Sequence, residues 1–336
     1  KKNNKKDFFL NKVILITGGT GSFGYTMTKR LLKIKSLKKI VLYSRDEQKH
    51  FEMEKYFNYN SRLRFFVGDI RDKSRLNLAL RDVDFVINAA AMKHVPISEY
   101  NPIECIKTNI YGLQNVIESS IENNVSRVLG VSTDKAVDPI NLYGATKLAG
   151  DKLLTAANNI SGGLHKRFSI VRYGNVFGSK GSVLPIFLDL LNKGKKKLPI
   201  TDLSMTRFSI TQKEGVEFVL YSLEHMLGGE TFIPKMYSLR IIDLISALIG
   251  KKNYEIIGIR PGEKLHETLC HNYNSQELIE FKKFYLLKPT INLTEKKNFK
   301  IINNENGKLK IKKFEYSSQN NRFLNLKEIK KLLRFN

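Results

Sequence analysis

The fold of this chain is decided by Val13-Ile14-Leu15-Ile16 and the turn that follows it, Thr17-Gly18-Gly19-Thr20-Gly21-Ser22-Phe23-Gly24. The first four residues are apolar and mostly β-branched, which predicts a buried parallel strand. A helical pattern comes next, with Met27 and Leu31 on one side. Glycines let a backbone approach a pyrophosphate closely, and a helix N-terminus attracts its negative charge. The turn therefore predicts a dinucleotide-binding site.

Strand patterns alternate with helical patterns along the chain. Further strands are expected at 39–43, 64–67, 84–87, 126–131 and 168–172, and later helices at 182–191, 211–226, 241–249 and 326–333. Such alternation predicts an α/β fold with a doubly wound parallel sheet of the Rossmann type, whose ligands lie at the carboxyl ends of the strands. We expect residues 10–175 to form this nucleotide-binding domain, which also carries the catalytic residues. We expect residues 176–336 to form mainly a smaller substrate-binding region, with some of its strands and helices returning to the first domain.

A candidate catalytic pair lies on one expected helix. Tyr143 and Lys147 are one helical turn apart, which puts them on the same face. An ammonium there stabilises the phenolate, so the pKa of the phenol is expected to fall until it can act as a base near neutral pH. Beside a nicotinamide cofactor, such a base oxidises an alcohol to a ketone. Asp134 and Lys135 lie just upstream. Simple oxidation does not need this second acid and amine, but a dehydration next to the new ketone does.

The second strand ends in residues that bear on the choice of cofactor. An acidic residue at this place suits a free ribose 2′-hydroxyl, whereas arginine suits a 2′-phosphate. Ser44 and Arg45 come first after the strand, which favours NADP over NAD. Asp46 keeps NAD open, and its other interpretation is an N-cap for the next helix.

Eight motifs in order resemble those of the C5-inverting UDP-N-acetylglucosamine 4,6-dehydratases, a family of the extended short-chain dehydrogenase/reductase superfamily. They are the glycine-rich turn, Tyr43-Ser44-Arg45-Asp46-Glu47, Met92-Lys93-His94-Val95-Pro96, Ser132-Thr133-Asp134-Lys135, Asn141-Leu142-Tyr143-Gly144-Ala145-Thr146-Lys147, Arg172-Tyr173-Gly174-Asn175-Val176, Met205-Thr206-Arg207-Phe208 and Arg260-Pro261-Gly262-Glu263-Lys264. The similarity runs from about residue 12 to at least residue 270. Lys135 marks the inverting group, because related retaining dehydratases usually carry Asp-Glu at this acid–base pair.

The resemblance implies a role for many residues. The implied catalytic residues are Thr133, Asp134, Lys135, Tyr143 and Lys147. The implied cofactor-binding residues are Gly18, Thr20, Gly21, Ser22, Phe23, Gly24, Ser44, Arg45, Asp69, Ile70, Ala89, Ala90, Lys93, Tyr143 and Lys147. The implied substrate-binding residues are Lys93, Thr133, Tyr173, Asn175, Arg207, Arg260 and Glu263. Of these, Arg207 and Arg260 are expected in loops, where their planar guanidinium groups suit the pyrophosphate of UDP.

The resemblance implies a lyase that removes water from UDP-N-acetylglucosamine and inverts C5. Tyr143 takes the O4 proton, Lys135 with a lowered pKa takes the C5 proton, and Asp134 protonates the departing O6. NADP stays tightly bound and is regenerated in each cycle. In the family this reaction opens the pseudaminic acid pathway, which supplies the glycan of bacterial flagellins. The alternatives are a UDP-hexose 4-epimerase, a retaining 4,6-dehydratase and a non-catalytic cofactor-binding regulator.

The composition bounds the partners. Lys and Arg number 57 against 32 Asp and Glu, a net charge of +25. The lysines are dispersed and are not interleaved with aromatic residues, which favours a solvated basic surface over nucleic-acid binding. Relatives form dimers through a helix pair and often larger rings, so the resemblance implies a homo-oligomer, with a hexamer among the expected forms.

Cysteine use and hydropathy predict a cytoplasmic protein. The two cysteines, Cys105 and Cys270, are far apart, which fits a reducing compartment. The sequence has neither a signal peptide nor an apolar run of about 18 residues that could span a membrane. Lys1 is not a start methionine, so missing upstream residues stay open. His266, Cys270 and His271 are interpreted as a helix surface, and we expect no metal.

Overall fold

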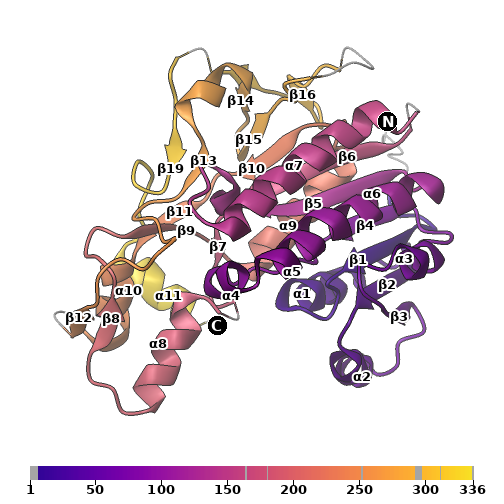
Figure 1. Cartoon of the computed structure of the whole chain (residues 1–336). Helices are drawn as coiled ribbons and strands as arrows, with labels where there is room; N and C mark the ends of the chain where they lie inside the picture. The colour runs from indigo at the N-terminus through magenta and orange to yellow at the C-terminus, as the bar shows by residue number, and fades with distance from the viewer. Residues whose placement is uncertain are drawn as a thin grey trace, which may run out of the picture.

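The centre of the molecule is a ten-stranded sheet with the strand order β18-β14-β15-β10-β6-β5-β4-β1-β2-β3. The structure, a computed structural model, describes residues 7–162, 165–179, 181–250, 253–291, 297–310 and 312–334. The parallel part of the sheet consists of β3 (Leu63–Val67), β2 (Lys39–Ser44), β1 (Val13–Thr17), β4 (Phe85–Asn88), β5 (Arg127–Thr133), β6 (Arg167–Tyr173) and β10 (Thr231–Pro234). An antiparallel edge of β15 (Phe284–Leu287), β14 (Leu278–Glu280) and β18 (Lys308–Leu309) completes it. The predicted doubly wound α/β fold is confirmed (Figure 1).

Helices cover both faces of the sheet. The helical elements of the described residues are α1 (Ser22–Leu31), α2 (Glu47–Tyr56), α3 (Lys73–Ala79), α4 (Val95–Tyr100), α5 (Pro102–Ile106), η1 (Lys107–Tyr111), α6 (Gly112–Glu122), η2 (Asp134–Ala136), α7 (Leu142–Ile160), α8 (Val183–Asn192), α9 (Gln212–His225), α10 (Ile241–Ile249), η3 (Asn272–Glu277) and α11 (Leu326–Arg334). Figure 1 shows α6 and α7 side by side across one face, and α1 packs against α9 on the other. The expected helices in the second half of the chain are confirmed as α8, α9, α10 and α11.

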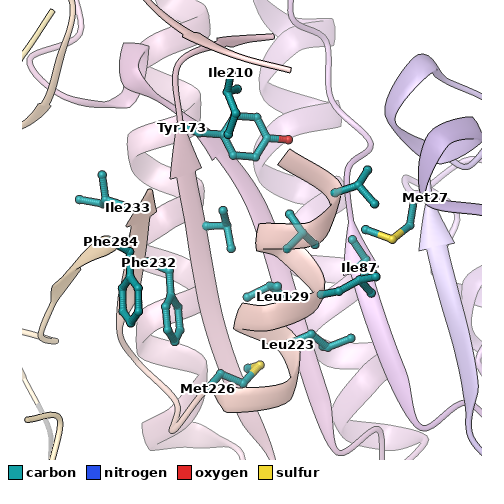
Figure 2. Close-up of a cluster of buried hydrophobic side chains, with 14 of the residues drawn as sticks. Met27, Ile87, Leu129, Tyr173, Ile210, Leu223, Met226, Phe232, Ile233 and Phe284 are labelled. Carbon is teal, nitrogen blue, oxygen red and sulfur yellow. The ribbon is translucent and has the colours of Figure 1, made fainter. Parts of the chain in front are cut away.

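The central strands β1 and β4 are buried along their whole length, because each face of the sheet packs against helices there. Ile14 and Ile16 belong to the core cluster with α1 and α9, while Val13 and Leu15 belong to the cluster with α3, α6 and α7. Figure 2 shows part of the first cluster, in which Met27 of α1 and Leu223 of α9 lie near Ile87. Because successive side chains of β1 point to opposite faces of the sheet, the strand contributes to both core clusters.

Four smaller sheets of the described residues lie outside the central sheet, from residue 175 onward. They are β11–β9–β7 (Tyr237–Arg240, Thr206–Ile210 and Asn175–Val176), β12–β8 (Tyr254–Ile256 and Leu198–Ile200), β13–β19 (Thr268–Cys270 and Tyr316–Ser317) and β16–β17 (Ile301–Ile302 and Glu305–Asn306). A third core cluster joins α8, β8, α10 and α11, at the lower left of Figure 1. Because β10, β14, β15 and β18 join the central sheet, chain from beyond residue 175 lies in both parts. The two-domain division at that residue stays a prediction. Across the described residues, no helix is both long and apolar enough to cross a lipid bilayer.

Candidate active site

The glycine-rich turn lies against the end of β4. Gly18 has φ +65°, a left-handed conformation that L-residues other than glycine rarely adopt. A Cβ on Gly18 would meet Ala89 O and the backbone of Ala90 at 3.1 Å. The turn therefore passes close to Ala89 and Ala90, two residues that the sequence assigns to the same site. Gly21 is the N-cap of α1 and Ser22 and Phe23 form its first turn, with no side chain capping the helix.

Side chains of the glycine-rich turn and of the end of β2 are in contact at the carboxyl edge of the central sheet. Thr20 Oγ1 lies 2.8 Å from Ser44 Oγ, so these two predicted cofactor residues are in direct contact. The guanidinium of Arg45 is 62% exposed and lies 3.8 Å from Asp69 Oδ2. Ile70 follows Asp69 and is buried. The edge thus places an accessible cation beside the turn.

Asp46 is the N-cap of α2, as one interpretation of the sequence predicts. Its carboxylate accepts a hydrogen bond of 3.0 Å from Lys49 N and forms an ion pair with the Lys49 side chain. These contacts hold the pKa of Asp46 below its usual range. The carboxylate therefore has local partners within its own helix.

The predicted acid and amine stand where β5 ends. Thr133 is its last residue, and η2 begins at Asp134. The Thr133 hydroxyl donates a hydrogen bond of 3.0 Å to Asp134 Oδ1, and it accepts one of 3.3 Å from Lys135 N. The side chain of Asp134 is fully buried and that of Lys135 is 25% exposed. The turn thus buries the acid and leaves the amine partly accessible.

Glycine at position 144 lets α7 approach this turn. A Cβ on Gly144 would lie 2.3 Å from Lys135 O, so any side chain there would push the helix away. The N-cap Asn141 accepts a hydrogen bond from Gly144 N and begins the helix at the same place. As a result Tyr143, in the first turn of α7, faces Lys135.

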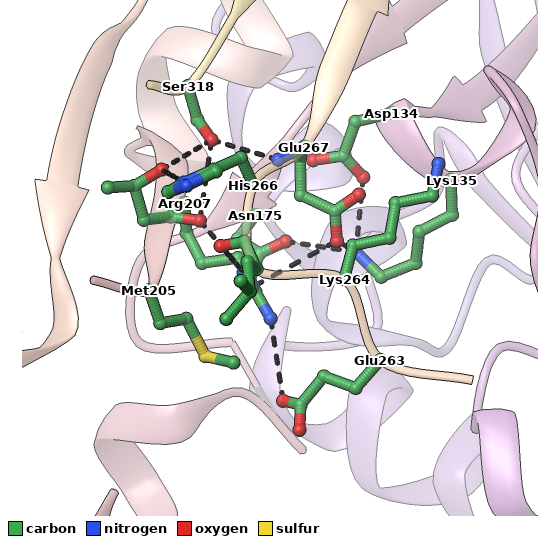
Figure 3. Close-up of polar contacts among 12 residues, drawn as sticks. Asp134, Lys135, Asn175, Met205, Arg207, Glu263, Lys264, His266, Glu267 and Ser318 are labelled. Carbon is green, nitrogen blue, oxygen red and sulfur yellow. Dashed lines mark hydrogen bonds and ion pairs between the residues drawn. The ribbon is translucent and has the colours of Figure 1, made fainter. Parts of the chain in front are cut away.

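Lys135 lies between two carboxyl groups. Its Nζ is 3.1 Å from Asp134 Oδ1 and 3.1 Å from Glu267 Oε1, and it donates a hydrogen bond of 3.4 Å to Asn175 Oδ1 (Figure 3). Glu267 is not among the site residues predicted from the sequence. The only signal available was an acidic residue directly before the short strand β13, and that signal is weak.

The charges of this cluster correct one sequence expectation. Burial lowers the pKa of Lys135, but Asp134 and Glu267 outweigh it and raise the pKa above its ordinary value. The predicted lowering is therefore wrong for this structure. Burial raises the pKa of Asp134, although Lys135 opposes the shift. Burial also raises the pKa of Glu267, but Lys135 and Arg207 outweigh it and leave the pKa below its usual range.

The phenol differs from expectation for a similar reason. Burial raises the pKa of Tyr143 to about 12, although the charge of Lys135 and a hydrogen bond with Thr133 lower it. Lys147 lies in α7 as predicted, but its Nζ donates a hydrogen bond of 2.8 Å to Val131 O. Burial lowers the pKa of Lys147. The expected fall in the phenol pKa is not present here, because burial dominates and the Lys147 ammonium is held by the end of β5.

A cavity of about 270 Å³ opens beside Lys135. It has an apolar wall, which includes Phe187, Ile200 and Ile241. The predicted substrate residues in its lining are Asn175, Arg207, Arg260 and Glu263. The other three predicted substrate residues, Lys93, Thr133 and Tyr173, lie outside that lining. Lys93 follows β4, and burial lowers its pKa. Tyr173 lies in the core (Figure 2).

The predicted position of Arg207 in a loop is wrong. Arg207 is the second residue of β9 and is buried. Its guanidinium donates hydrogen bonds to Thr206 O and Leu265 O, and it lies 3.4 Å from Glu263 Oε1 and 3.9 Å from Glu267 Oε1. These partners satisfy its donors and allow a buried arginine in a short strand. Arg260 lies in a loop, as expected.

Comparison with known proteins accounts for this arrangement. The model of the polysaccharide biosynthesis protein family matches residues 14–289. The chain belongs to this family. The predicted resemblance within it is also confirmed, because the chain is 56% identical over 315 residues to the UDP-N-acetylglucosamine 4,6-dehydratase (inverting) of Campylobacter jejuni subsp. jejuni serotype O:23/36, strain 81-176. That match covers 93% of this chain and 94% of the relative.

Two further proteins are similar to this chain over nearly their whole length. The UDP-glucose 4-epimerase of Rickettsia akari is 39% identical over 334 residues, covering 97% of this chain and 96% of the relative. The X-ray structure of Pen from Bacillus thuringiensis has a TM-score of 0.87 at 34% identity, covering 98% of this chain and 100% of that one. The chain is thus similar both to a protein named as a dehydratase and to one named as an epimerase.

His266, Cys270 and His271, which were predicted to form a helix surface without a metal, lie in other surroundings. The interpretation as a helix surface is wrong, because Cys270 is buried in β13 and His271 follows it. His266 Nδ1 lies 2.8 Å from Thr206 Oγ1, and His271 Nε2 lies 3.4 Å from Asp138 Oδ2. Over the described part of the chain, His, Cys, Asp and Glu form no group of three or more that could hold a metal ion.

Proposed function

We propose that this protein is a UDP-N-acetylglucosamine 4,6-dehydratase that inverts C5 and releases UDP-2-acetamido-2,6-dideoxy-β-L-arabino-hex-4-ulose. The observation that carries the proposal is the buried Asp134 with Lys135 beside it, at the wall of the cavity. An epimerase has no step for this acid and amine, whereas water loss needs both. The 56% identity to a dehydratase of this name supports the same conclusion. The reaction is the first step of pseudaminic acid or related surface-glycan synthesis, including flagellin glycosylation.

The cavity suits a nucleotide sugar. Arg207 and Arg260 supply planar cations for a pyrophosphate, and the apolar wall suits a base and ribose. Asn175 is in contact with Lys135 and so links this subsite to the reacting end. The net charge of +25 attracts an anionic substrate over a longer range.

The cofactor is NADP, held by the glycine-rich turn. The close approach of Gly18 to Ala89 and the uncapped start of α1 leave backbone near a bound pyrophosphate, which fits a dinucleotide. Arg45 is accessible for a 2′-phosphate, while Asp46 is engaged in capping α2. When bound, the nicotinamide accepts hydride from C4 of the sugar and later returns it to C6.

Oxidation at C4 depends on Tyr143, which takes the O4 proton. Although burial raises the pKa of this phenol to about 12, the positive charge of Lys135 favours the phenolate. Lys147 supplies a second ammonium in the same helix. Thr133, at the end of β5, gives up its hydrogen bond to Asp134 and donates one to the developing C4 oxygen instead.

Elimination then uses the acid–base pair. The C4 ketone acidifies C5, whose proton passes to the free amine of Lys135 while the C5–H electrons form the C5–C6 double bond. The C6–O6 bond breaks, and Asp134 gives its proton to O6, which leaves as water. Burial raises the pKa of Asp134 and so keeps a proton available for this step. After hydride returns to C6, a proton adds to C5 from the opposite face. Tyr143 and Lys135 each gain a proton, and Asp134 and the C5 donor each lose one, so the cycle balances.

One experiment separates this function from its rivals. The purified protein is incubated with UDP-N-acetylglucosamine in deuterated water, and the product is identified by NMR. The expected product has lost water, carries deuterium at C5 and has the inverted configuration. A C4 epimer would support the UDP-hexose 4-epimerase alternative, and an unchanged C5 configuration would support a retaining dehydratase. The absence of turnover with any UDP-sugar would support a non-catalytic regulator.

The protein is a homo-oligomer, with a hexamer among the expected forms. The segment from α4 to η1 supports this part of the proposal, because it exposes Ile97, Tyr100, Ile103 and Tyr111, with Tyr100 87% exposed. This segment packs along α7, so a pair of copies could join their helices there. Light scattering of the parent and of the double variant Tyr100→Glu/Ile103→Glu tests it, and a monomeric parent would contradict it.

A further inference from the structure

Glu267 is placed to exchange a proton with Lys135. Its Oε1 is 3.1 Å from Lys135 Nζ, and its side chain is 2% exposed. Its Oε2 is buried, and among the described residues it has no hydrogen-bond partner. A buried carboxylate oxygen without a partner is costly unless it has another role.

The backbone of Glu267 is held by a segment far along the chain. Glu267 N donates a hydrogen bond of 2.9 Å to Ser318 Oγ, and Ser318 N donates one of 2.8 Å to Glu267 O. Ser318 follows β19, which pairs with β13, and Figure 3 shows its hydroxyl at the backbone nitrogen of Glu267. The position of the carboxylate therefore rests on two strands instead of a loose loop.

We propose, as a refinement of the function above, that Glu267 is a positioning residue that takes the proton of Lys135 and so frees the amine to act as the base at C5. The proton moves from the Lys135 ammonium to the Glu267 carboxylate, which leaves a neutral amine and a neutral carboxylic acid. The amine then takes the C5 proton, and the proton on Glu267 is available to restore the pair later in the cycle. No oxidant or further reactant is needed.

The inference follows from the charges around the amine. An ammonium paired with a carboxylate cannot remove a proton from carbon, and the raised pKa of Lys135 means that release to solvent is unfavourable near neutral pH. The charged or titratable groups that face the Lys135–Glu267 pair are Asp134 of η2, Arg207 of β9, Lys264 of the loop before β13 and Tyr143 of α7. Burial raises the pKa of Asp134 and so favours its protonated form, whereas the pKa of Glu267 lies below its usual range. Of the two carboxyl groups that contact the amine, Glu267 is therefore the one that favours the ionised form.

The test is Glu267→Gln, which keeps the shape and removes the proton acceptor. Elimination is followed by NMR, and C4 oxidation is followed in a single turnover by absorbance at about 340 nm, where the reduced nicotinamide absorbs. We expect oxidation to persist and elimination to slow by about 10²-fold or more at neutral pH, from the lower end of the range for a lost proton-transfer group upward. Since the variant must release the Lys135 proton to solvent, the parent-to-variant rate ratio should fall up to about tenfold per pH unit between about pH 6.5 and 8.5.

Two further variants make the result specific. Glu267→Asp keeps a carboxylate, so we expect its rate ratio to the parent to be independent of pH even where its rate is lower. Glu230→Gln removes a buried glutamate that accepts hydrogen bonds from Ser169 and Leu227 at the amino end of β10. That end is opposite the site, so this variant should keep the parental pH profile.

A Glu267→Gln variant with the parental rate, or with a rate ratio that does not change with pH, overturns the inference. Equal loss of oxidation and elimination also overturns it, because the residue would then be structural. If the parent does not dehydrate the substrate, both the proposed function and this inference are refuted. If the parent dehydrates the substrate and the Glu267→Gln variant does so at the same rate, only the inference is refuted.

Discussion

Lys135 Nζ and Glu267 Oε1 lie 3.1 Å apart, although the two residues are distant in the sequence. Lys135 follows the central strand β5, and Glu267 directly precedes β13, a strand of a small sheet from the second half of the chain. This ion pair joins the two parts of the molecule at the reacting end of the cavity. It also means that the protonation of Lys135 depends on a residue that no local motif contains.

Lys135→Ala should separate oxidation from elimination. Tyr143 and Lys147 are retained, so oxidation at C4 should continue, although more slowly because the charge of Lys135 no longer favours the phenolate. The C5 proton then has no base. The variant should stall with reduced cofactor, visible in a single turnover as lasting absorbance at about 340 nm. Dehydration at a rate near that of the parent would show that Lys135 has a structural role beside Asp134.

Lys135→Glu should be harmful on its own and should improve when Glu267 is neutralised. The substitution places a third carboxyl group next to Asp134 and Glu267, which lie on either side of the amine in the parent. We expect the free energy of unfolding to fall by about 3 kcal/mol, the scale for breaking a buried ion pair. The double variant Lys135→Glu/Glu267→Gln should recover stability and some elimination, because a carboxylate is also a base.

Thermal denaturation and NMR of the product provide the measurements for this pair of variants. The original C5 configuration in the product of the double variant would mark Lys135 as the residue that sets inversion. Equal stability of the single and double variants would argue against electrostatic coupling between positions 135 and 267.

Tyr143→Phe should retain cofactor and lose turnover by about 10²-fold or more, the cost of removing a general base. The side chain is buried and has close to the same shape in both residues, so the fold should persist. Cofactor content is measured from the absorbance of the purified variant, and turnover by NMR. Activity within a few-fold of the parent would refute the role of this phenol.

Asp134→Asn should abolish elimination and stabilise the fold. Burial raises the pKa of Asp134 above the value of about 3.9 in the unfolded chain. Its contribution to stability is therefore fully present below about pH 3.9 and is lost as the pH rises through the raised value. Asn does not titrate, so the melting temperature of the variant relative to the parent should increase from about pH 4 to pH 7. A constant difference would show that Asp134 is ionised in the folded protein.

Mass spectrometry of cofactor released from the purified protein should find NADP. Arg45→Ala should weaken NADP binding by about tenfold, the value of one charge-assisted hydrogen bond, and leave NAD binding nearly unchanged. The matched control is Asp46→Ala, which removes the cap of α2 and should lower stability without reversing the preference. Mainly NAD in the parent would show that Asp46 decides the cofactor.

Much of the scaffold could be predicted because its signals are local. The strand at 13–16 is apolar on both faces, and its turn contains Gly18, whose positive φ suits glycine. The cap at Asp46 could also be anticipated from its place before a helix. Arg207 and Cys270 were misplaced, because each lies in a short strand whose neighbours come from distant segments. A strand of three to five residues in a small sheet leaves little periodic pattern to find.

The sequence alone determined the strand–turn–helix, the order of the parallel strands' motifs and the adjacency of Asp134 and Lys135, because each depends on residues close together in the chain. Only the tertiary structure decided the protonation of the site. Burial raises the pKa of Tyr143 and of Asp134, and Glu267 meets Lys135 only after β13 packs beside β5's end. Burial and the approach of distant charges are properties of the folded chain, so no local pattern contains them.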